Sequence, residues 1–236
     1  MPNPVWDLVS DRERRRPSEP LLTHLTADGS RTELSARTLA NNVAKAAGAL
    51  RDEAMLDPGT VIGLRIPWHW QRSVWALAAW SVGIGVDLGS SGEFDLIAPG
   101  LPVAPGVPTW VVSMHPFGLP NASLPDGADD AALMMRLQPD AFLADEVDGT
   151  TLALRANSHD VSIAEVLDRA AQLVAPFTDA EQRRFVVLPG DDVDGVLWCT
   201  VAALVGDAAV VLVDDGVDAD RVAAAERARV ARRIAD

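Results

Sequence analysis

The stretch TVIGLRIPWHWQRSVWALAAWSVGIGVDL, residues 60–88, decides the fold class of this chain. Residues 60–66 are mostly apolar and β-branched, which is typical of a buried strand. Apolar side chains then recur every three or four residues, as on one helix face: Trp70, Val74, Leu77 and Trp80. Residues 84–88 return to a short strand. Strand, helix and strand in this order predict a βαβ unit with parallel pairing and a right-handed crossover.

Similar patterns extend on both sides of this unit. Further strands are predicted at residues 109–114, 140–147, 150–156, 183–190 and 207–214. Helices are predicted at residues 18–26, 162–176, 193–206 and 218–234, and a short extended piece leading into a long helix at 31–55. Asp148-Gly149, between two of these strands, predicts a β-hairpin. The order of elements predicts an α/β protein with mostly parallel sheets and flanking helices.

The chain shows no internal repeat and no long linker, so we expect one α/β domain over residues 1–236. Two Pro/Gly-rich loops interrupt the pattern on either side of the strand at residues 109–114. The alternative organisation therefore has two lobes, about residues 18–97 and 140–236, joined by the Pro/Gly-rich region 98–130.

The charge of the chain excludes some classes of partner. It carries 20 basic and 34 acidic residues, a formal net charge of −14. Because this charge repels phosphate backbones and anionic lipids, we expect neither nucleic acid nor a membrane surface as a partner. Residues 74–86 form the longest apolar stretch and are too few to span a bilayer. The N-terminus has no apolar core of a secretory signal, so we expect a cytoplasmic protein.

Residue types that often carry chemistry are scattered. Cys199 is the only cysteine and lies in an apolar run, which favours a small buried side chain over a catalytic thiol. Four histidines show no helical pairing that would predict a zinc site: His24, His69, His115 and His159. Three serines lack the Gly-x-Ser-x-Gly pattern of hydrolases: Ser73, Ser90 and Ser91. We therefore predict no catalytic residue and no metal site among them.

Several stretches resemble the N-terminal part of the adenylate-forming superfamily, which comprises acyl-CoA synthetases, luciferases and peptide-synthetase adenylation domains. The matching stretches are RTELSARTLANNVAKAAGAL at 31–50, DPGTVIGLRIP at 57–67, VWALAAWSVGIGVDL at 74–88 and RRFVVLPGDDVDGVLWCTVAALVGDAAVVLV at 183–213. They are collinear with the family from about Pro20 to Val213. More narrowly, the chain is similar to a small group of actinobacterial proteins that are distant relatives of the AMP-binding enzymes.

The resemblance assigns a degenerate phosphate loop to DGTTLALRANSHD, residues 148–160. The family's loop reads Thr-Ser-Gly-Thr-Thr-Gly-x-Pro-Lys-Gly, and its backbone N–H groups hold phosphate oxygens. Four residues here would carry that role, with ATP or AMP as the ligand: Gly149, Thr150, Thr151 and Arg155. Asp148 replaces the serine and Leu152 the glycine, so a structural hairpin is the alternative. Ser158-His159 occupies the place of the family's Thr-His, and fewer residues separate it from the loop than in the family.

The later motifs of the family depart further. LPGDDVDG lacks the family's histidine and offers Asp191, Asp192 and Asp194. Three carboxylates favour either Mg²⁺ or an acidic turn that caps the next helix, and we expect the cap. The family's acidic ATP motif, its ribose-binding aspartate and its lid domain with the catalytic lysine correspond to positions beyond Asp236. Lys45, the only lysine, lies in the first long helix and cannot replace that lysine.

Trp68, His69 and Trp70 in PWHW lie at a strand-to-helix corner that faces the substrate side in the family. Their side chains either line a pocket or partner surface or pack in the core, and we expect core packing.

The sequence as a whole favours a non-catalytic binding or interaction protein on an adenylate-forming scaffold, without a cofactor. It would act through a protein partner or self-association. Two alternatives remain open: a vestigial enzyme that binds ATP, AMP or an acyl-adenylate through the degenerate phosphate loop, and a purely structural subunit.

Overall fold

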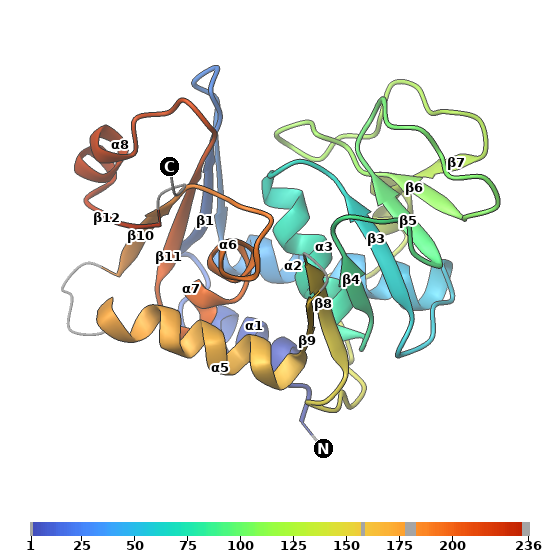
Figure 1. Cartoon of the computed structure of the whole chain (residues 1–236), viewed down its shortest axis with the longest axis horizontal. Helices are drawn as coiled ribbons and strands as arrows, with labels where there is room; N and C mark the ends of the chain where they lie inside the picture. The colour runs from blue at the N-terminus through green and yellow to red at the C-terminus, as the bar shows by residue number, and fades with distance from the viewer. Residues whose placement is uncertain (1, 157–158, 178–182, 233–236) are drawn as a thin grey trace. The chain divides into compact units, whose positions relative to one another are not determined.

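The structure is a computed structural model that describes residues 2–156, 159–177 and 183–232. The described chain divides into two compact units, each with its own sheet (Figure 1). The seven-stranded unit comprises Met1–Trp6 and Asn41–Ile163, and the five-stranded unit comprises Asp7–Ala40 and Ala164–Asp236. The chain therefore passes between the units more than once.

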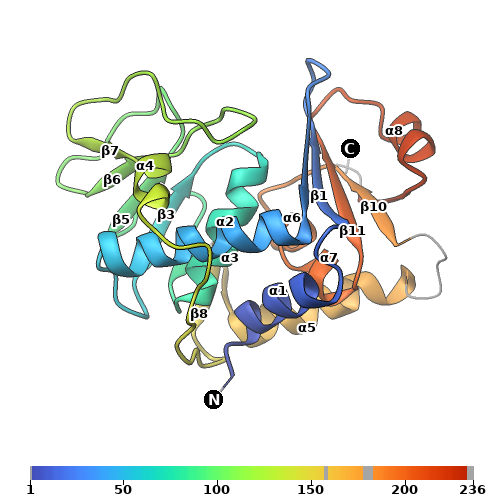
Figure 2. The same cartoon turned by 180° about the vertical axis from the view of Figure 1, so that it is seen from behind.

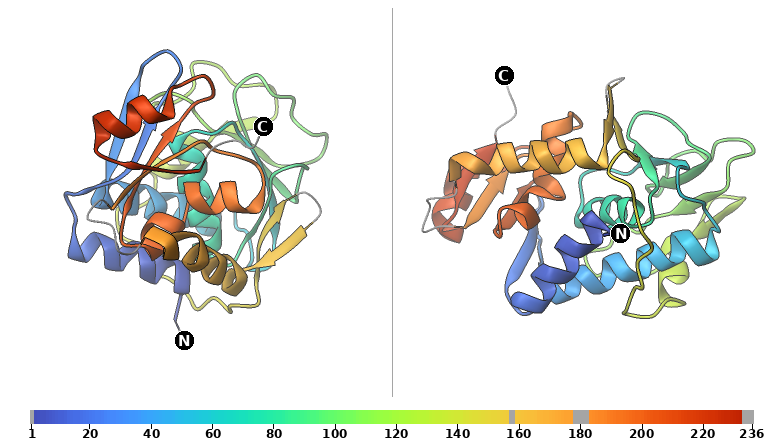
Figure 3. Two further views of the ribbon diagram at one scale, coloured as in Figure 1. Left: turned by 60° about the vertical axis from the view of Figure 1, so that its left-hand side comes forward. Right: turned by 90° about the horizontal axis from the view of Figure 1, so that it is seen from below.

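The seven-stranded sheet has the order β7-β6-β5-β3-β4-β8-β9. Neighbouring strands are parallel except for β8 and β9, which are antiparallel. The strands are β3 (Val61–Arg65), β4 (Gly85–Asp87), β5 (Phe94–Ile97), β6 (Thr109–Val111), β7 (Ala128–Asp130), β8 (Leu152–Ala156) and β9 (His159–Ser162). The strands β8 and β9 project as a pair in Figure 3.

Helices α3 (Trp70–Ser81) and α4 (Ala131–Arg136) lie beside this sheet, as does the part of α2 (Ala36–Gly48) from Asn41 on (Figure 2). A short π-helix, Ala49–Glu53, continues α2. The predicted βαβ unit is confirmed, because α3 connects β3 to its parallel neighbour β4. Every residue of α3 is buried. The helix is buried on all sides although it carries polar side chains such as Gln71 and Arg72, so α3 is the core helix of this unit.

Two glycines let the chain pass close to β3. A Cβ at Gly63 would lie 2.3 Å from Asp95 Oδ1, and a Cβ at Gly92 would lie 2.3 Å from Val61 O. The backbone of β3 fills the space at Gly92, and Asp95 fills the space at Gly63. Asp95 is fully buried and accepts a hydrogen bond from Arg65 Nη2 at 2.5 Å. The buried ion pair and the glycines therefore depend on one another.

The five-stranded sheet has the order β12-β10-β11-β1-β2, parallel except for the β1–β2 pair. Its strands are β1 (Pro20–Leu25), β2 (Arg31–Ser35), β10 (Arg184–Val187), β11 (Ala209–Val213) and β12 (Arg229–Arg232). Its helices are α1 (Pro4–Arg15), whose first turn belongs to the other unit, α5 (Ile163–Val174), α6 (Val193–Cys199), α7 (Ala202–Val205) and α8 (Ala219–Glu226), with a 3₁₀ turn at Ala175–Phe177.

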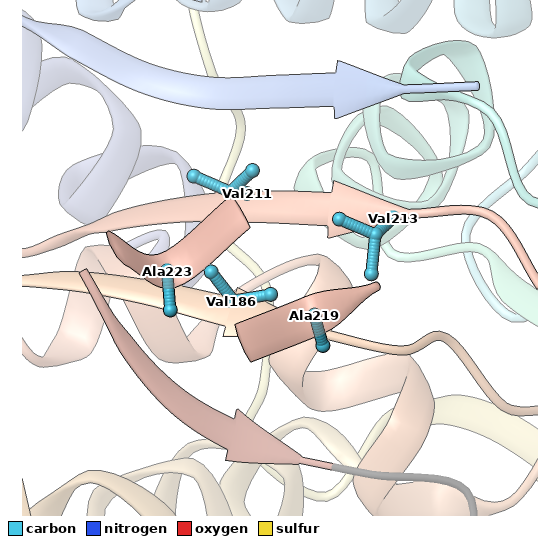
Figure 4. Close-up of a cluster of buried hydrophobic side chains, with 5 residues drawn as sticks. All are labelled: Val186, Val211, Val213, Ala219 and Ala223. Atoms are coloured by element: carbon cyan, nitrogen blue, oxygen red, sulfur yellow. The ribbon is translucent and has the colours of Figure 1, made fainter. Parts of the chain in front are cut away.

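Side-chain alternation along β10 and β11 builds two apolar layers. On one face, alternate valines pack against two alanines of α8 (Figure 4): Val186, Val211 and Val213 with Ala219 and Ala223. On the other face, Phe185 packs edge-on against Trp198 of α6, with ring centroids 5.5 Å apart. Helices thus cover both faces, as a mostly parallel sheet requires.

Three predicted elements are wrong. Residues 18–26 form β1 instead of a helix, because this buried run pairs with both β11 and β2. Residues 140–147 form no regular element, and Leu143 is 87% exposed. The terminal helix ends at Glu226, after which Arg227 is left-handed and β12 pairs with β10. Short apolar runs do not distinguish helix from strand, so tertiary pairing decides.

Other differences are smaller. The buried helix predicted at 193–206 is two helices, α6 and α7, separated at Thr200 and Val201. The expected hairpin around Asp148-Gly149 lies instead between β8 and β9. Five further elements were not predicted: α1, β5, β7, α4 and β9. Within the described residues, no helix is long and apolar enough to cross a membrane.

Candidate functional site

The segment Asp148–Thr151, where the sequence predicts phosphate-binding residues, is an exposed turn before β8. Asp148 Oδ1 accepts hydrogen bonds from the Thr150 backbone N–H and from the Thr150 hydroxyl, both at 2.7 Å. The Thr151 N–H donates to the backbone carbonyl of Asp148 at 3.0 Å. The backbone bond from Thr150, followed by its hydroxyl, lowers the pKa of the Asp148 carboxyl. The turn is therefore closed by its own aspartate.

Arg155, the fourth predicted site residue, lies near the other end of β8. Its guanidinium donates two hydrogen bonds to the Asp160 carboxylate on β9, at 2.8 and 3.0 Å. Asp87 Oδ2, at the end of β4, is 3.9 Å from Arg155 Nη1. The strand register explains why the three side chains lie together, because Arg155 is the register partner of Asp87 on β4 and of Asp160 on β9.

The charge of Arg155 is thus held by carboxylates. Hydrogen bonding to Asp160 raises the pKa of Arg155, and the same bond lowers the pKa of Asp160. At about 3.3 Å per residue, an extended chain places the Cα of Arg155 roughly 13 Å from that of Thr151. The structure therefore brings Gly149, Thr150 and Thr151 together but directs Arg155 toward Asp160.

His159 is the first residue of β9 and is exposed, while Ser158 lies outside the described residues. The other histidines are dispersed over both units: His24 contacts Asp214, His69 caps α3, and His115 accepts a bond from the Phe117 N–H. The described residues contain no group of three potential metal-ligating side chains. Cys199 is buried in α6.

The acidic turn caps a helix, as expected. Asp192 is the N-cap of α6 and accepts a bond from the Gly195 N–H at 3.1 Å. Its other oxygen accepts from Arg232, and Asp194 pairs with Arg169. Arginines therefore hold two of the three carboxylates that resembled a Mg²⁺ site.

The aromatic corner at residues 67–70 belongs mostly to the core. Trp70 is 4% exposed, and its Nε1 donates to the backbone carbonyl of Pro116 at 3.2 Å. Trp68 stacks under the guanidinium of Arg72, 4.0 Å from its ring centroid. The expected core packing of Trp70 is confirmed. One side of Trp70 nevertheless lines a small cavity of about 190 Å³.

This cavity of the seven-stranded unit combines aromatic and basic side chains. Trp70 and Phe117 line it together with Lys45 and Arg136. Phe117 is 81% exposed, and Lys45 Nζ lies 2.7 Å from Asp140 Oδ1. Sequence reasoning named Trp70 but missed Phe117, because nothing local indicates that a loop residue meets α4.

A basic pocket in the five-stranded unit was also missed. Arg12, Arg16, Arg183 and Arg227 meet there from three separate stretches of the chain. The signal available in the sequence was the arginine-rich run RERRR at residues 12–16, and only the fold shows what it faces.

Comparison with known proteins places the chain among relatives. No profile of a known protein family matches it. A Mycobacterium tuberculosis protein, described as a TIGR03089 family protein, is 32% identical over 202 residues, which are 78% of this chain and 80% of that protein. The chain belongs to the TIGR03089 family.

Solved structures confirm the predicted fold. A Brucella canis acyl-CoA synthetase superposes with a TM-score of 0.73 at 16% identity, over 94% of this chain and 45% of that one. The N-terminal domain of FACL13 from Mycobacterium tuberculosis, solved with an inhibitor, gives 0.68 at 15% identity, over 95% and 61%. The fold is that of the N-terminal domain of adenylate-forming enzymes. The chain spans about half the length of the Brucella synthetase.

Proposed function

We propose that this chain is a non-catalytic binding or interaction protein built on the fold of an adenylate-forming N-terminal domain. One observation carries the proposal: in the segment whose sequence resembles the family's phosphate loop, the chain's own carboxylates bind the groups that would hold a phosphate. Asp148 accepts hydrogen bonds from the backbone N–H and the hydroxyl of Thr150. Asp160 accepts two hydrogen bonds from the guanidinium of Arg155.

The energetics of anion binding support this proposal. A phosphate loop works because its backbone N–H groups are unpaired and point at the phosphate oxygens. A nucleotide at Thr150 would first have to displace Asp148, whose charge would then lie beside the phosphate. Arg155 would have to give up its two hydrogen bonds to the Asp160 carboxylate in order to bind phosphate, and this loss removes most of the free energy gained from the phosphate.

Exposed apolar side chains support a role in binding a partner. On the seven-stranded unit they include Phe117 at 81%, Leu137 at 66% and Leu143 at 87% exposure. Large apolar side chains in contact with water are common singly, and those beside a cavity are candidates for contact with a partner. Phe117 is the one that also lines the cavity at Trp70. A protein partner or a second copy of the chain is therefore the expected ligand class.

Calorimetric titration with ATP and AMP, with and without Mg²⁺, tests the proposal. The variant Thr150→Ala/Arg155→Ala is titrated in parallel, and Thr38→Ala/Arg37→Ala serves as a matched control on α2. We expect no saturable heat that depends on Thr150 and Arg155. Micromolar binding that this variant loses and the control keeps would instead establish the nucleotide-binding alternative.

Self-association is measured on the same protein by sedimentation. A dimer that Phe117→Ser dissociates would identify the second copy as the partner. A monomer at all concentrations would direct the search to a different protein.

A further inference from the structure

A pocket of about 500 Å³ lies at the edge of the five-stranded sheet where its parallel strands begin. Pro20, Arg184 and Ala209, the first residues of β1, β10 and β11, line it. The pocket therefore lies at the amino-terminal ends of these strands. Its remaining walls are mainly arginines.

One carboxylate, Asp207, stands at the centre of this group. Four guanidinium groups contact it: Arg16 at 3.1 Å, Arg15 and Arg183 at 3.3 Å each, and Arg12 at 3.8 Å. Glu19 adds a second carboxylate, 3.3 Å from Arg16 and 3.5 Å from Arg12. Since each carboxylate serves several arginines, the positive charge of the group is only partly neutralised.

Arg12 is the buried member of the group. Its side chain is 2% exposed, and among the described residues neither Nε nor Nη1 has a hydrogen-bond partner. Burial of a charge without close partners is costly. Desolvation accordingly lowers the pKa of Arg12, against the opposing effect of Asp207. A further negative charge in the pocket would stabilise the Arg12 cation.

Arg183 and Arg227 are the accessible members. The Arg183 side chain is 51% exposed, and within the part of the chain that the structure describes its carboxylate contact is the shared Asp207. Arg227 is exposed, and no carboxylate of the described residues forms an ion pair with it. Arg227 and Asp207 both have positive φ angles, 50° and 49°, which residues other than glycine seldom adopt. Arg227 is the C-cap of α8 and Asp207 follows the C-cap of α7, positions where a left-handed residue commonly ends a helix.

The charge balance of the lining sets the valence of a ligand. Arg184 is neutralised separately, by Glu33 at 3.0 Å and Glu226 at 2.9 Å. Among the described residues, the remaining lining has four arginines, Arg12, Arg16, Arg183 and Arg227, against Glu19 and Asp207. The surplus of two positive charges contrasts with the net charge of −14 of the chain. A dianion would neutralise this surplus.

We propose that this pocket binds the phosphate group of a small phosphorylated molecule. A phosphate monoester carries nearly two negative charges at neutral pH, and arginine forks match its oxygens in geometry. The volume is in the range of small-molecule sites. Pro20, Ala208 and Ala209 provide an apolar wall for the organic part of the molecule.

Calorimetric titration of the full chain with inorganic phosphate near pH 8, at constant ionic strength, tests the proposal. We expect a saturable 1:1 isotherm with Kd below about 1 mM. Arg183→Gln/Arg227→Gln removes two accessible donors and is expected to weaken binding at least tenfold, since bonds to charged groups are the stronger ones. Absence of saturable heat from the unaltered chain would overturn the proposal.

Two control variants locate the binding. Arg221→Gln changes an exposed arginine of α8 that does not line the pocket, and it should leave the affinity within about twofold. Thr150→Ala/Arg155→Ala should also bind phosphate normally. Loss of binding in either control, or normal binding in Arg183→Gln/Arg227→Gln, would contradict the pocket assignment.

Two further anions test the valence. Sulfate, a dianion of similar shape, should compete with phosphate, whereas acetate should bind at least about tenfold more weakly because it carries one charge. Acetate that binds as tightly as phosphate would refute the charge argument. If ATP binds to the chain and the heat survives in the Thr150→Ala/Arg155→Ala variant, its loss in Arg183→Gln/Arg227→Gln assigns that heat to this pocket. The proposed function then stands unchanged.

Discussion

The two units treat their arginines differently. In the seven-stranded unit each arginine of interest has a carboxylate of its own: Arg65 holds buried Asp95 and Arg155 holds Asp160. In the five-stranded unit four arginines share Asp207. The first arrangement is self-contained, and the second retains a surplus of positive charge.

This difference shows that residue type alone does not make an anion site. Thr150 and Arg155 are residues that a phosphate loop uses, yet neighbouring carboxylates already hold them. Arg183 and Arg227 belong to no phosphate-binding motif of the family, yet they line a pocket in which arginines outnumber carboxylates among the described residues. What decides is the number of donors left after internal pairing. The following predictions test that contrast, beginning with the largest expected effect.

Removal of the buried carboxylate should break the seven-stranded unit. Asp95→Ala leaves Arg65, which is 20% exposed, without its partner and is expected to cost about 3–5 kcal/mol of unfolding free energy. Urea denaturation followed by tryptophan fluorescence measures this loss. Asp160→Ala removes the partner of Arg155 at the surface and should lower the midpoint far less. Equal effects of the two variants would remove the distinction between buried and exposed pairs.

The close approach around Asp95 provides a second test. Gly63→Ala would place its Cβ 2.3 Å from Asp95 Oδ1 and 2.7 Å from the Ser90 carbonyl, and should cost about 1–3 kcal/mol. Gly89→Ala is the matched control, because its Cβ would meet only Asp87 Oδ1 at 3.8 Å. The same denaturation experiment compares them, and a neutral Gly63→Ala would show that the strands separate without cost.

Removal of the charge of Asp207, the shared carboxylate of the five-stranded unit, should lower stability but strengthen anion binding. Asp207→Asn keeps the shape and tolerates the positive φ, but it leaves four arginines without their common partner. We expect a loss of about 1–2 kcal/mol in phosphate-free buffer. Phosphate should then raise the melting temperature more in this variant than in the unaltered chain. A smaller rise would indicate that Asp207 organises the pocket rather than competes with the anion.

The smallest effect concerns the exposed pair on β8 and β9. Because Arg155 lowers the pKa of Asp160, this pair stabilises the fold at pH values above the ordinary aspartate range. That contribution is lost as the pH falls through the lowered pKa. Arg155→Ala should raise the pKa of Asp160 toward its ordinary value in an NMR titration. The titration of Asp148, which Thr150 controls, should remain unchanged.

Strong periodic patterns explain the parts of the fold that could be predicted. The β3-α3-β4 unit was predictable because a helix with a regular apolar face lies between two β-branched runs. The strand β1 was not, because a buried run of a few residues fits a helix as well as a strand until β11 lies beside it. The short strands β5 and β7 were hidden among prolines and glycines.

The candidate site was also predictable from the sequence only in part. Sequence identified Gly149, Thr150, Thr151 and Arg155 by likeness to a motif, and it noted that Asp148 and Leu152 depart from the motif. It could not show that Arg155 faces Asp160, since this follows from the register of β8 against β9. It could not assemble Arg12, Arg183 and Arg227, which are far apart in the chain.

The sequence by itself determined the fold class and the superfamily likeness, because hydrophobic periodicity and collinear motifs are local properties. Only the tertiary structure decided which charges are paired, because pairing depends on distances between residues remote in sequence. Coulomb energies fall with distance and rise with burial. The charge of Arg155 is therefore neutralised by its own carboxylate, whereas Arg183, which shares its carboxylate, can bind an anion.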